Sequence, residues 1–291
     1  MIVNSPSTPK IHADPWTSIR QSIGDRLTAG MRIVDLSAPI VASPQSTPDL
    51  LRTEIQFVDH AGGAAHIASM FGVGRDLLRE GEGWAVETFT RLATHNSTHV
   101  DAPYHYNSTI AGRPAQTIDQ LPLDWFFRPG VVLDFHDRAD GLTIEVADLE
   151  TALETAGHEL AERNIVLIRT GRDAYYSEVD YMSRGPGVSA TATRWLYDRG
   201  VRVMGIDAWG WDRPLHLQAD EALATGRSGI FWAAHQADLA YSQIERLAHL
   251  DRLPSSGFTV ACFPLRLVGG SAAPARVVAI LDEGPPASSR H

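Results

Sequence analysis

Short runs of β-branched and aromatic residues recur along the chain, and segments with helical periodicity lie between some of them. Six of these runs are rich in valine, isoleucine or phenylalanine and are bounded by glycine, proline or aspartate, a pattern typical of buried strands. The predicted strands are Arg32–Leu36, Val131–Phe135, Ile165–Arg169, Val201–Ile206, Phe258–Phe263 and Val277–Leu281.

Two segments between these runs have the spacing of helices. In Val146–Glu162, leucine and alanine residues recur three and four positions apart and form one apolar stripe, which Gly157 interrupts. Ala190–Asp198 is a shorter predicted helix, with Ser189 in the N-cap position and Gly200 just past its end.

Strands that alternate with helices predict an α/β fold with a mixed central β-structure flanked by helices. The segment Glu54–Tyr106 departs from this alternation: it has many β-formers and no clean helical stripe, so we expect further strands or long ordered loops there. No linker-like change in composition divides the chain. We therefore predict a single domain over residues 31–284, preceded by a mobile N-terminal arm (1–30) and followed by a tail (285–291).

Composition and charge narrow the possible partners. Among 291 residues, 44% are hydrophobic, and 25 basic residues oppose 35 acidic ones, for a net charge of −10. Without a basic run the chain is a poor nucleic-acid binder, and without eighteen consecutive apolar residues no membrane-spanning helix is expected. The single cysteine, Cys262, cannot form an internal disulfide and lies in an apolar run typical of inert core. These features predict a cytoplasmic protein that binds neither nucleic acid nor a membrane.

Three of the twelve histidines fall within eleven residues, at His95, His99 and His105, with Asp101 and Pro103 between them. Two imidazoles and one carboxylate suit Zn, Mn or Fe(II), and such a set leaves coordination positions open for catalysis. His105 follows a proline that stiffens the chain, and it is a candidate general acid or base beside the ion.

The spacing of this cluster restricts its conformation. In a continuous strand, which rises about 3.3 Å per residue, His95 and His99 would lie about 13 Å apart, too far to share one ion. In a helix, Asp101 would turn to another face and the following proline would break the helix. The ligands can therefore converge only if the chain bends near Asn96 and Ser97 and is extended from His99 onward.

Residues 95–105 resemble the motif His-x-Gly-Thr-His-x-Asp-x-Pro-x-His of the metal-dependent cyclase-like hydrolases, the family of kynurenine formamidase and isatin hydrolase. Ser97 stands in place of the motif glycine, and every other motif position matches. The resemblance implies a fold of the swivelling β/β/α type and a catalytic role for His105. The metal-binding positions that it implies are His95, His99, Asp101, His235 and Glu245.

Shorter segments extend the resemblance over most of the chain. Ile33–Ser37 resembles the family's opening strand, and Gly205–Asp207 resembles the end of its central strand. Ile244–Leu250 is similar to its glutamate-bearing helix or turn. Phe263–Leu267 and Ala275–Ala279 are similar to its closing strands.

Residue chemistry alone leaves several of these roles open. His235 lies among apolar residues and could be a buried histidine bonded to the backbone. Glu245 taken by itself is typical of a solvated helix. Asp207 follows an apolar strand, where it could bind a ligand or cap the next turn.

Four aromatic residues are candidates for contact with a planar substrate. Trp209 and Trp211 lie close together after Asp207; Phe71 precedes the histidine cluster, and Tyr104 lies within it, directly before His105. All four could equally be core or subunit-interface residues, because large apolar side chains are common in both places.

The resemblance implies a hydrolase that uses one or two divalent ions, Zn or Mn, and assembles as a homodimer or homotetramer. We expect it to cleave a non-peptide C–N bond in a cyclic amide or an N-acyl arylamine, with His105 orienting water or protonating the leaving nitrogen. One alternative is an arylformamidase acting on N-formylkynurenine, although the chain is longer than that subgroup leads us to expect. The other is a non-catalytic, metal-stabilised binding protein, for which Ser97 in the motif is the only hint.

Overall fold

Within the described residues of this computed structural model (30–44, 47 and 49–282), nine strands form one sheet in the order β1-β15-β13-β7-β9-β11-β12-β4-β14. The neighbours from β7 to β12 are parallel, and the strands on both sides of them are antiparallel. Three two-stranded ribbons pair β2 with β3, β5 with β6, and β8 with β10. The predicted arm, except Gly30, and the predicted tail lie outside the described residues.

The elements have the following bounds. The strands are β1 Met31–Asp35, β2 Glu54–Val58, β3 Val86–Arg91, β4 His99–Asp101, β5 Thr109–Ile110, β6 Arg113–Pro114, β7 Phe127–Asp134, β8 Thr143–Ile144, β9 Ile165–Arg169, β10 Gly187–Val188, β11 Val203–Ile206, β12 Ser242–Glu245, β13 Phe258–Ala261, β14 Ala272–Pro274 and β15 Val278–Asp282. The α-helices are α2 His60–Phe71, α3 Pro103–Tyr106, α4 Val146–Ala156, α5 Ala190–Asp198 and α6 Leu215–Thr225.

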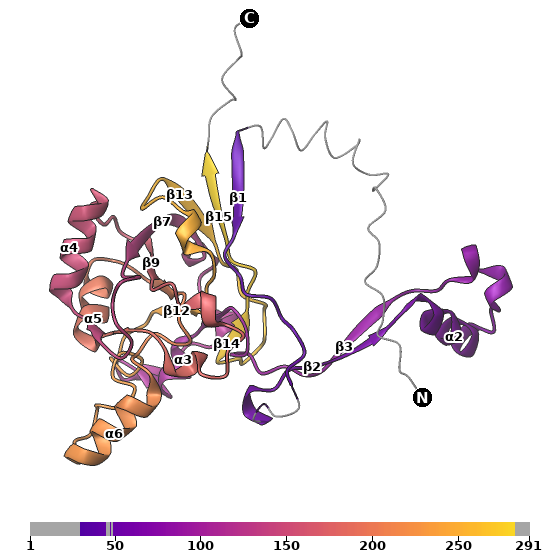
Figure 1. The fold of residues 1–291 in the computed structure, drawn as a ribbon, viewed down its shortest axis with the longest axis horizontal. Coiled ribbons are helices and arrows are strands. Elements are labelled where there is room, and N and C mark those ends of the chain that lie inside the picture. The colour runs from indigo at the N-terminus through magenta and orange to yellow at the C-terminus, as the bar shows by residue number, and fades with distance from the viewer. Residues whose placement is uncertain (1–29, 45–46, 48, 283–291) are drawn as a thin grey trace, which may run out of the picture.

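The central parallel strands are buried on both faces, which explains their unbroken apolar runs. In β9, Val166 and Ile168 point toward a core shared with α4 and α5, to which α5 contributes Leu196. Ile165 and Leu167 point to the opposite face and join a second core. Figure 1 shows α4 and α5 together on one side of the sheet.

The second core shows that the sheet curls around its other face. Each of the nine strands contributes a buried apolar side chain to it, so strands from both edges face the same interior. These side chains include Val34, Val100, Val132, Leu167, Val203, Ile244, Val260, Ala273 and Leu281. The α/β fold with a mixed central sheet flanked by helices is thus confirmed. No helix in the described part of the chain is long and apolar enough to cross a membrane.

The two predicted helices are present, and one of them is shorter than expected. α5 has the predicted bounds, and the side chain of its N-cap, Ser189, accepts a hydrogen bond from the Ala192 amide. The expectation that the other helix reaches Glu162 is wrong. α4 ends at Ala156, because Gly157 adopts a left-handed conformation (φ 59°) and caps the helix.

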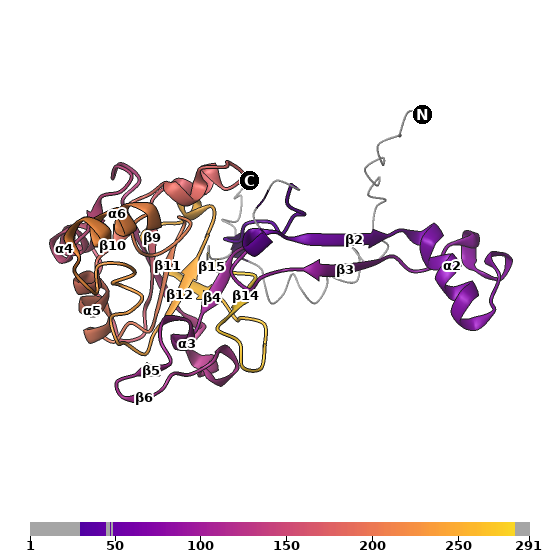
Figure 2. The same ribbon diagram turned by 90° about the horizontal axis from the view of Figure 1, so that it is seen from below.

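The expectation of no helix within 54–106 is also wrong, because α2 lies at the tip of the β2–β3 ribbon. Figures 1 and 2 show this ribbon projecting from the body of the molecule, with α2 at its far end. Only Gly63 and Ala64 of the helix are buried, so the helix has no core-facing stripe to reveal it. Gly63 packs against the backbone of Trp84, whose carbonyl oxygen would lie 1.7 Å from an added Cβ atom.

Two of the family-derived expectations near the C-terminus also need correction. Ile244–Leu250 is not a helix: its first residues belong to strand β12, which ends at Glu245. Phe263–Leu267 is not a strand; only an isolated bridge joins Pro264 to Ala275. A proline cannot donate a ladder hydrogen bond, which prevents regular pairing at this point.

Burial on both faces makes β9 central to stability. Leu167 is fully buried, so Leu167→Ala should lower the free energy of unfolding by about 2–5 kcal/mol. Leu223 on α6 is 83% exposed, so Leu223→Ala should change it by less than about 0.5 kcal/mol. Urea unfolding followed by circular dichroism measures both effects. Equal midpoints for the two variants would contradict the proposed core.

Candidate metal centre and active site

The chain bends before β4, as the sequence predicts. The Asn96 amide donates to the Ala93 carbonyl at 3.1 Å, and the extended strand begins at His99. Val100 points into the curled-sheet core, and alternation along the strand therefore directs His99 and Asp101 to the opposite face. The bend brings His95 back to the same face.

The bend is anchored to the segment that follows β12. Thr98 Oγ1 donates to the Arg246 carbonyl at 2.5 Å and accepts from the Ala38 amide at 2.8 Å. β4 and β12 are antiparallel, with His99 opposite Glu245. Their side chains therefore lie on the same face of the sheet, where the imidazole and the carboxylate approach each other.

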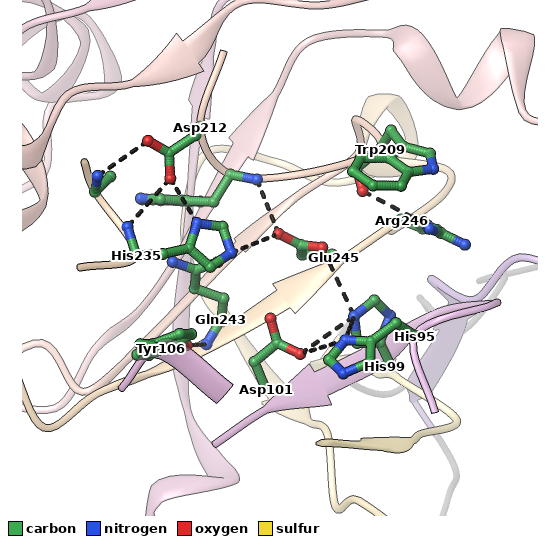
Figure 3. Close-up of polar contacts among 12 residues, drawn as sticks. His95, His99, Asp101, Tyr106, Trp209, Asp212, His235, Gln243, Glu245 and Arg246 are labelled. Carbon is green, nitrogen blue, oxygen red and sulfur yellow. Dashed lines mark hydrogen bonds and ion pairs between the residues drawn. The ribbon is translucent and has the colours of Figure 1, made fainter. Parts of the chain in front are cut away.

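His95, His99 and Asp101 converge in a small triangle (Figure 3). His95 Nδ1 lies 3.1 Å from His99 Nε2 and 3.0 Å from Asp101 Oδ1, and His99 Nε2 lies 3.3 Å from that same oxygen. Ligand atoms bound about 2.0–2.2 Å from one ion lie about 3.0–3.5 Å apart. The three side chains therefore fit a shared divalent ion.

The chemistry of the triangle also fits a cation. Asp101 is completely buried, and apart from the His95 and His99 imidazoles neither of its oxygens has a hydrogen-bond partner among the described residues, an arrangement that is costly for an ionised group. Burial alone would raise the pKa of Asp101, but the nearby His99, His105 and His95 rings hold it well below its ordinary value. His99 Nδ1 lies 2.7 Å from the Ser97 carbonyl, to which it donates, so Nε2 keeps its lone pair for a ligand.

Glu245 completes a second, overlapping group of possible ligands with His99 and Asp101. Its Oε2 lies 3.6 Å from His99 Nε2, and its Oε1 accepts from the Trp211 amide at 2.9 Å. The carboxylate is buried at the end of β12, so the alternative of a solvated helix residue is wrong.

His235, which the family resemblance predicts to be a metal ligand, lies between Asp212 and Glu245. Its Nδ1 lies 2.5 Å from Asp212 Oδ2, and its Nε2 lies 3.5 Å from Glu245 Oε1. Burial would lower the pKa of His235, but hydrogen bonds to Asp212 and Glu245 outweigh it and raise the pKa to about 10. Both ring nitrogens then donate to carboxylates. His235 Nε2 thus lies beside the Glu245 carboxylate, and the role of His235 as a metal ligand stays a prediction.

His105 lies on α3, a single helical turn that begins with Pro103. Its ring centroid is 4.0 Å from that of His95 and 5.0 Å from that of Trp232. Burial lowers the pKa of His105 to about 4, so the ring is neutral near pH 7 and can accept a proton. A neutral imidazole beside the metal ligands is placed to act as a general base.

A cavity of about 370 Å³ opens beside these groups, within the range of small-molecule sites. Its lining combines histidines of the cluster with aromatic and basic side chains. It includes His95, His105, Trp209, Phe231, Trp232 and Arg246.

Of the four candidate substrate-contact residues, only Trp209 lines this cavity. Trp211 is fully buried in the core beneath α5, where its indole nitrogen donates to Thr193 Oγ1. Tyr104 is exposed and lies outside the cavity lining. Phe71 lies on α2 at the far end of the projecting ribbon, against the ring of Trp84.

Several residues that the sequence analysis missed complete the site. Asp212 receives hydrogen bonds from His235, and Trp232 stacks on the same ring at a centroid distance of 4.4 Å. Arg246 follows Glu245 directly and lines the cavity. No short-range spacing marks Asp212, because its partner lies 23 residues away.

Asp207 stays outside this cluster and has a structural role. It accepts hydrogen bonds from the Thr170 amide and hydroxyl and from the Gly171 amide, so it holds the loop that follows β9. Burial raises the pKa of Asp207 to about 6. Cys262 is fully buried in the curled-sheet core, as expected of an inert thiol.

Comparison with known proteins agrees with this geometry. The sequence profile of the Cyclase family ("Putative cyclase") matches residues 34–213, which is more than half of the chain. The chain belongs to the Cyclase family. The expected family is thus confirmed, and its curated relatives include hydrolases.

The Cyclase family relatives include two with named activities. The chain is 32% identical over 192 residues to the kynurenine formamidase of Salinibacter ruber. The aligned region covers 65% of this chain and 76% of the relative. The chain is also 27% identical over 205 residues to the isatin hydrolase of Roseibium aggregatum, and this alignment covers 66% of this chain and 73% of the relative. The structure of isatin hydrolase A from Ralstonia solanacearum superimposes with a TM-score of 0.68 at 21% identity, over 96% of this chain and all of that one. This superposition supports the fold.

Removal of one ligand of the triangle should abolish metal retention. Loss of a residue that merely supports a ligand typically weakens metal affinity about 10–100-fold, so His99→Ala should weaken it by more than about 100-fold. Inductively coupled plasma mass spectrometry of dialysed protein measures the effect. His158→Ala, which changes a histidine outside the cluster, should retain the metal of the parent protein. Full metal content in His99→Ala would remove His99 from the site.

Proposed function

We propose that this Cyclase family member hydrolyses a non-peptide C–N bond in a cyclic amide or an N-acyl arylamine. The observation that carries the proposal is the triangle formed by buried His99 and Asp101 and partly exposed His95, beside a cavity with aromatic walls. The similarity to a kynurenine formamidase and an isatin hydrolase supports the same bond type.

His95, His99 and Asp101 would hold a divalent ion, Zn or Mn, and Glu245 offers a further carboxylate oxygen for that ion or a second one. When bound, the ion would polarise the substrate carbonyl and lower the pKa of water toward neutrality. The chain itself contributes the proton transfers. Neutral His105 accepts a proton from the attacking water and then gives it to the departing nitrogen, which leaves poorly as an anion.

The surrounding side chains position these groups. The Trp211 amide and His235 hold the Glu245 carboxylate from its far side, which fixes its direction toward His99. Trp209 and Trp232 form apolar walls on which a planar substrate can lie, and they keep bulk water from the reacting carbonyl.

A substrate panel tests the proposal. Metal-loaded protein should hydrolyse at least one compound among formanilide, N-formylkynurenine, isatin and a cyclic imide, monitored by absorbance. Preference for N-formylkynurenine would favour the alternative of an arylformamidase, which the kynurenine formamidase relative supports. Inactivity of the metal-loaded protein toward the whole panel would favour a non-catalytic binding protein of the same fold.

His105→Ala should separate catalysis from metal binding. Because a positioned acid or base contributes about 10²–10⁴-fold, kcat should fall by that factor while the metal content stays that of the parent protein. The measurement combines steady-state kinetics with metal analysis of one preparation. Undiminished kcat would exclude His105 from the mechanism.

We also propose that the protein forms a homo-oligomer, a homodimer or homotetramer, through the projecting ribbon. Phe57 on β2 and Phe89 on β3 are 70% and 50% exposed, an unusual arrangement for large aromatic side chains on an isolated arm. Phe71 on the same arm would reach a cavity only in a second copy. A cytoplasmic location stays a prediction.

Light scattering after size-exclusion chromatography tests this assembly. The parent protein should elute as an oligomer, and Phe57→Ser combined with Phe89→Ser should shift it to smaller species because the apolar contact is lost. Val179 is fully exposed on the body, so Val179→Ser serves as the control and should leave the mass unchanged. A monomeric parent protein would contradict the proposal.

A further inference from the structure

Arg246 is a largely buried cation that forms no ion pair at contact distance with any described residue. Its side chain is only 6% exposed, and no carboxylate lies within ion-pair distance of it in the part of the chain that the structure describes. The other two arginines that line the cavity are paired, Arg184 with Asp180 and Arg213 with Glu221. A buried charge without a partner is unfavourable, which indicates that a ligand supplies the counter-charge.

The contacts of Arg246 leave most of its donors unused. Nε reaches the Trp209 carbonyl at 3.5 Å, and no other hydrogen bond joins the guanidinium to a described residue. The guanidinium carbon lies 4.9 Å from the centroid of the Trp209 ring, which also lines the cavity. Figure 3 shows Arg246 and Trp209 on one side of Glu245 and the Asp212–His235 pair on the other.

The backbone conformation at Arg246 does not require an arginine. Its φ is 57°, in the left-handed region that glycine and asparagine adopt at lower cost. Two hydrogen bonds hold the main chain here: the Arg246 amide donates to the Ala208 carbonyl, and Thr98 Oγ1 donates to the Arg246 carbonyl. Neither involves a side-chain atom of Arg246. Any residue could make them, so the arginine side chain itself requires another explanation.

The charges of the neighbouring groups leave a net positive region. Asp101 and Glu245 together balance one divalent ion, and Asp212 is paired with His235. Arg246 therefore adds a positive charge that the site does not neutralise, and a second ion would increase the excess. A planar guanidinium is the side chain best suited to binding a carboxylate with two hydrogen bonds.

We propose that Arg246 binds a carboxylate of the substrate, so that the preferred substrates are amides that carry a carboxylate on or near an aromatic ring. The ring would lie against Trp209 while the carboxylate meets the guanidinium, and the amide would face the triangle. The inference rests on the proposed function for its choice of substrate and assigns Arg246 the role of a specificity-determining residue.

Matched substrates test the proposal. Metal-loaded parent protein is assayed with formanilide and with 2-, 3- and 4-formamidobenzoate, which differ from it only by one carboxylate. At least one isomer should exceed formanilide in kcat/KM by about 10–100-fold, the effect expected of a charge-assisted hydrogen bond. A parent protein that shows no preference for any isomer would overturn the proposal.

Three variants then test whether Arg246 causes the preference for the carboxylate-bearing substrate. Arg246→Asn, which suits the left-handed backbone, should lose the kcat/KM ratio of the favoured isomer over formanilide without a lower melting temperature. Arg246→Lys keeps the charge and should retain part of the ratio. Arg184→Asn removes a cavity arginine that already has a partner and should leave the ratio unchanged. An unchanged ratio in Arg246→Asn would contradict the proposal.

A binding measurement tests the role of Arg246 even if the proposed hydrolysis is not observed. If the parent protein hydrolyses none of these amides, the proposed function fails, and titration with benzoate and benzamide still tests Arg246 through tryptophan fluorescence. Benzoate should bind more tightly than benzamide, and Arg246→Asn should remove the difference. A difference that persists in Arg246→Asn would place the carboxylate elsewhere, for instance on the metal, and would overturn the assignment.

Discussion

The buried carboxylate of Asp101 is the constraint on which the site depends. Among the described residues its only close polar neighbours are two imidazole nitrogens, which lie 3.0 and 3.3 Å from one of its oxygens. An ionised group in such a place is stable only beside a cation. The bend before β4, the short strand itself and the opposing Glu245 all serve to bring ligands around this one carboxylate.

The curled sheet provides the rigid support that such a cluster requires. β4 and β12 lie next to each other, so His99, Asp101 and Glu245 come from paired strands, and His95 comes from the bend that leads directly into β4. The segment after β11 has a divided role: Asp207 and Trp211 anchor it in the protein, while Trp209 between them lines the cavity. Anchored and cavity-facing residues thus alternate along one short segment.

The sequence predicts what is determined locally. β9 and α5 have the predicted bounds, because burial on both faces and a serine N-cap leave direct marks in the sequence. The bend at the histidine cluster follows from spacing alone. Long-range pairs leave no such mark, and the contact of Asp212 with His235 is one example. The same holds for α2, whose helix faces no core, and for Arg246, whose significance depends on the absence of a partner.

The most direct test of the account is an anomalous diffraction measurement at the absorption edge of the bound metal, on protein purified without chelators. The account predicts a peak about 2.0–2.3 Å from His95 Nδ1, His99 Nε2 and Asp101 Oδ1 together. A metal found elsewhere in the molecule, or no anomalous peak among these three side chains in metal-loaded crystals, would contradict it.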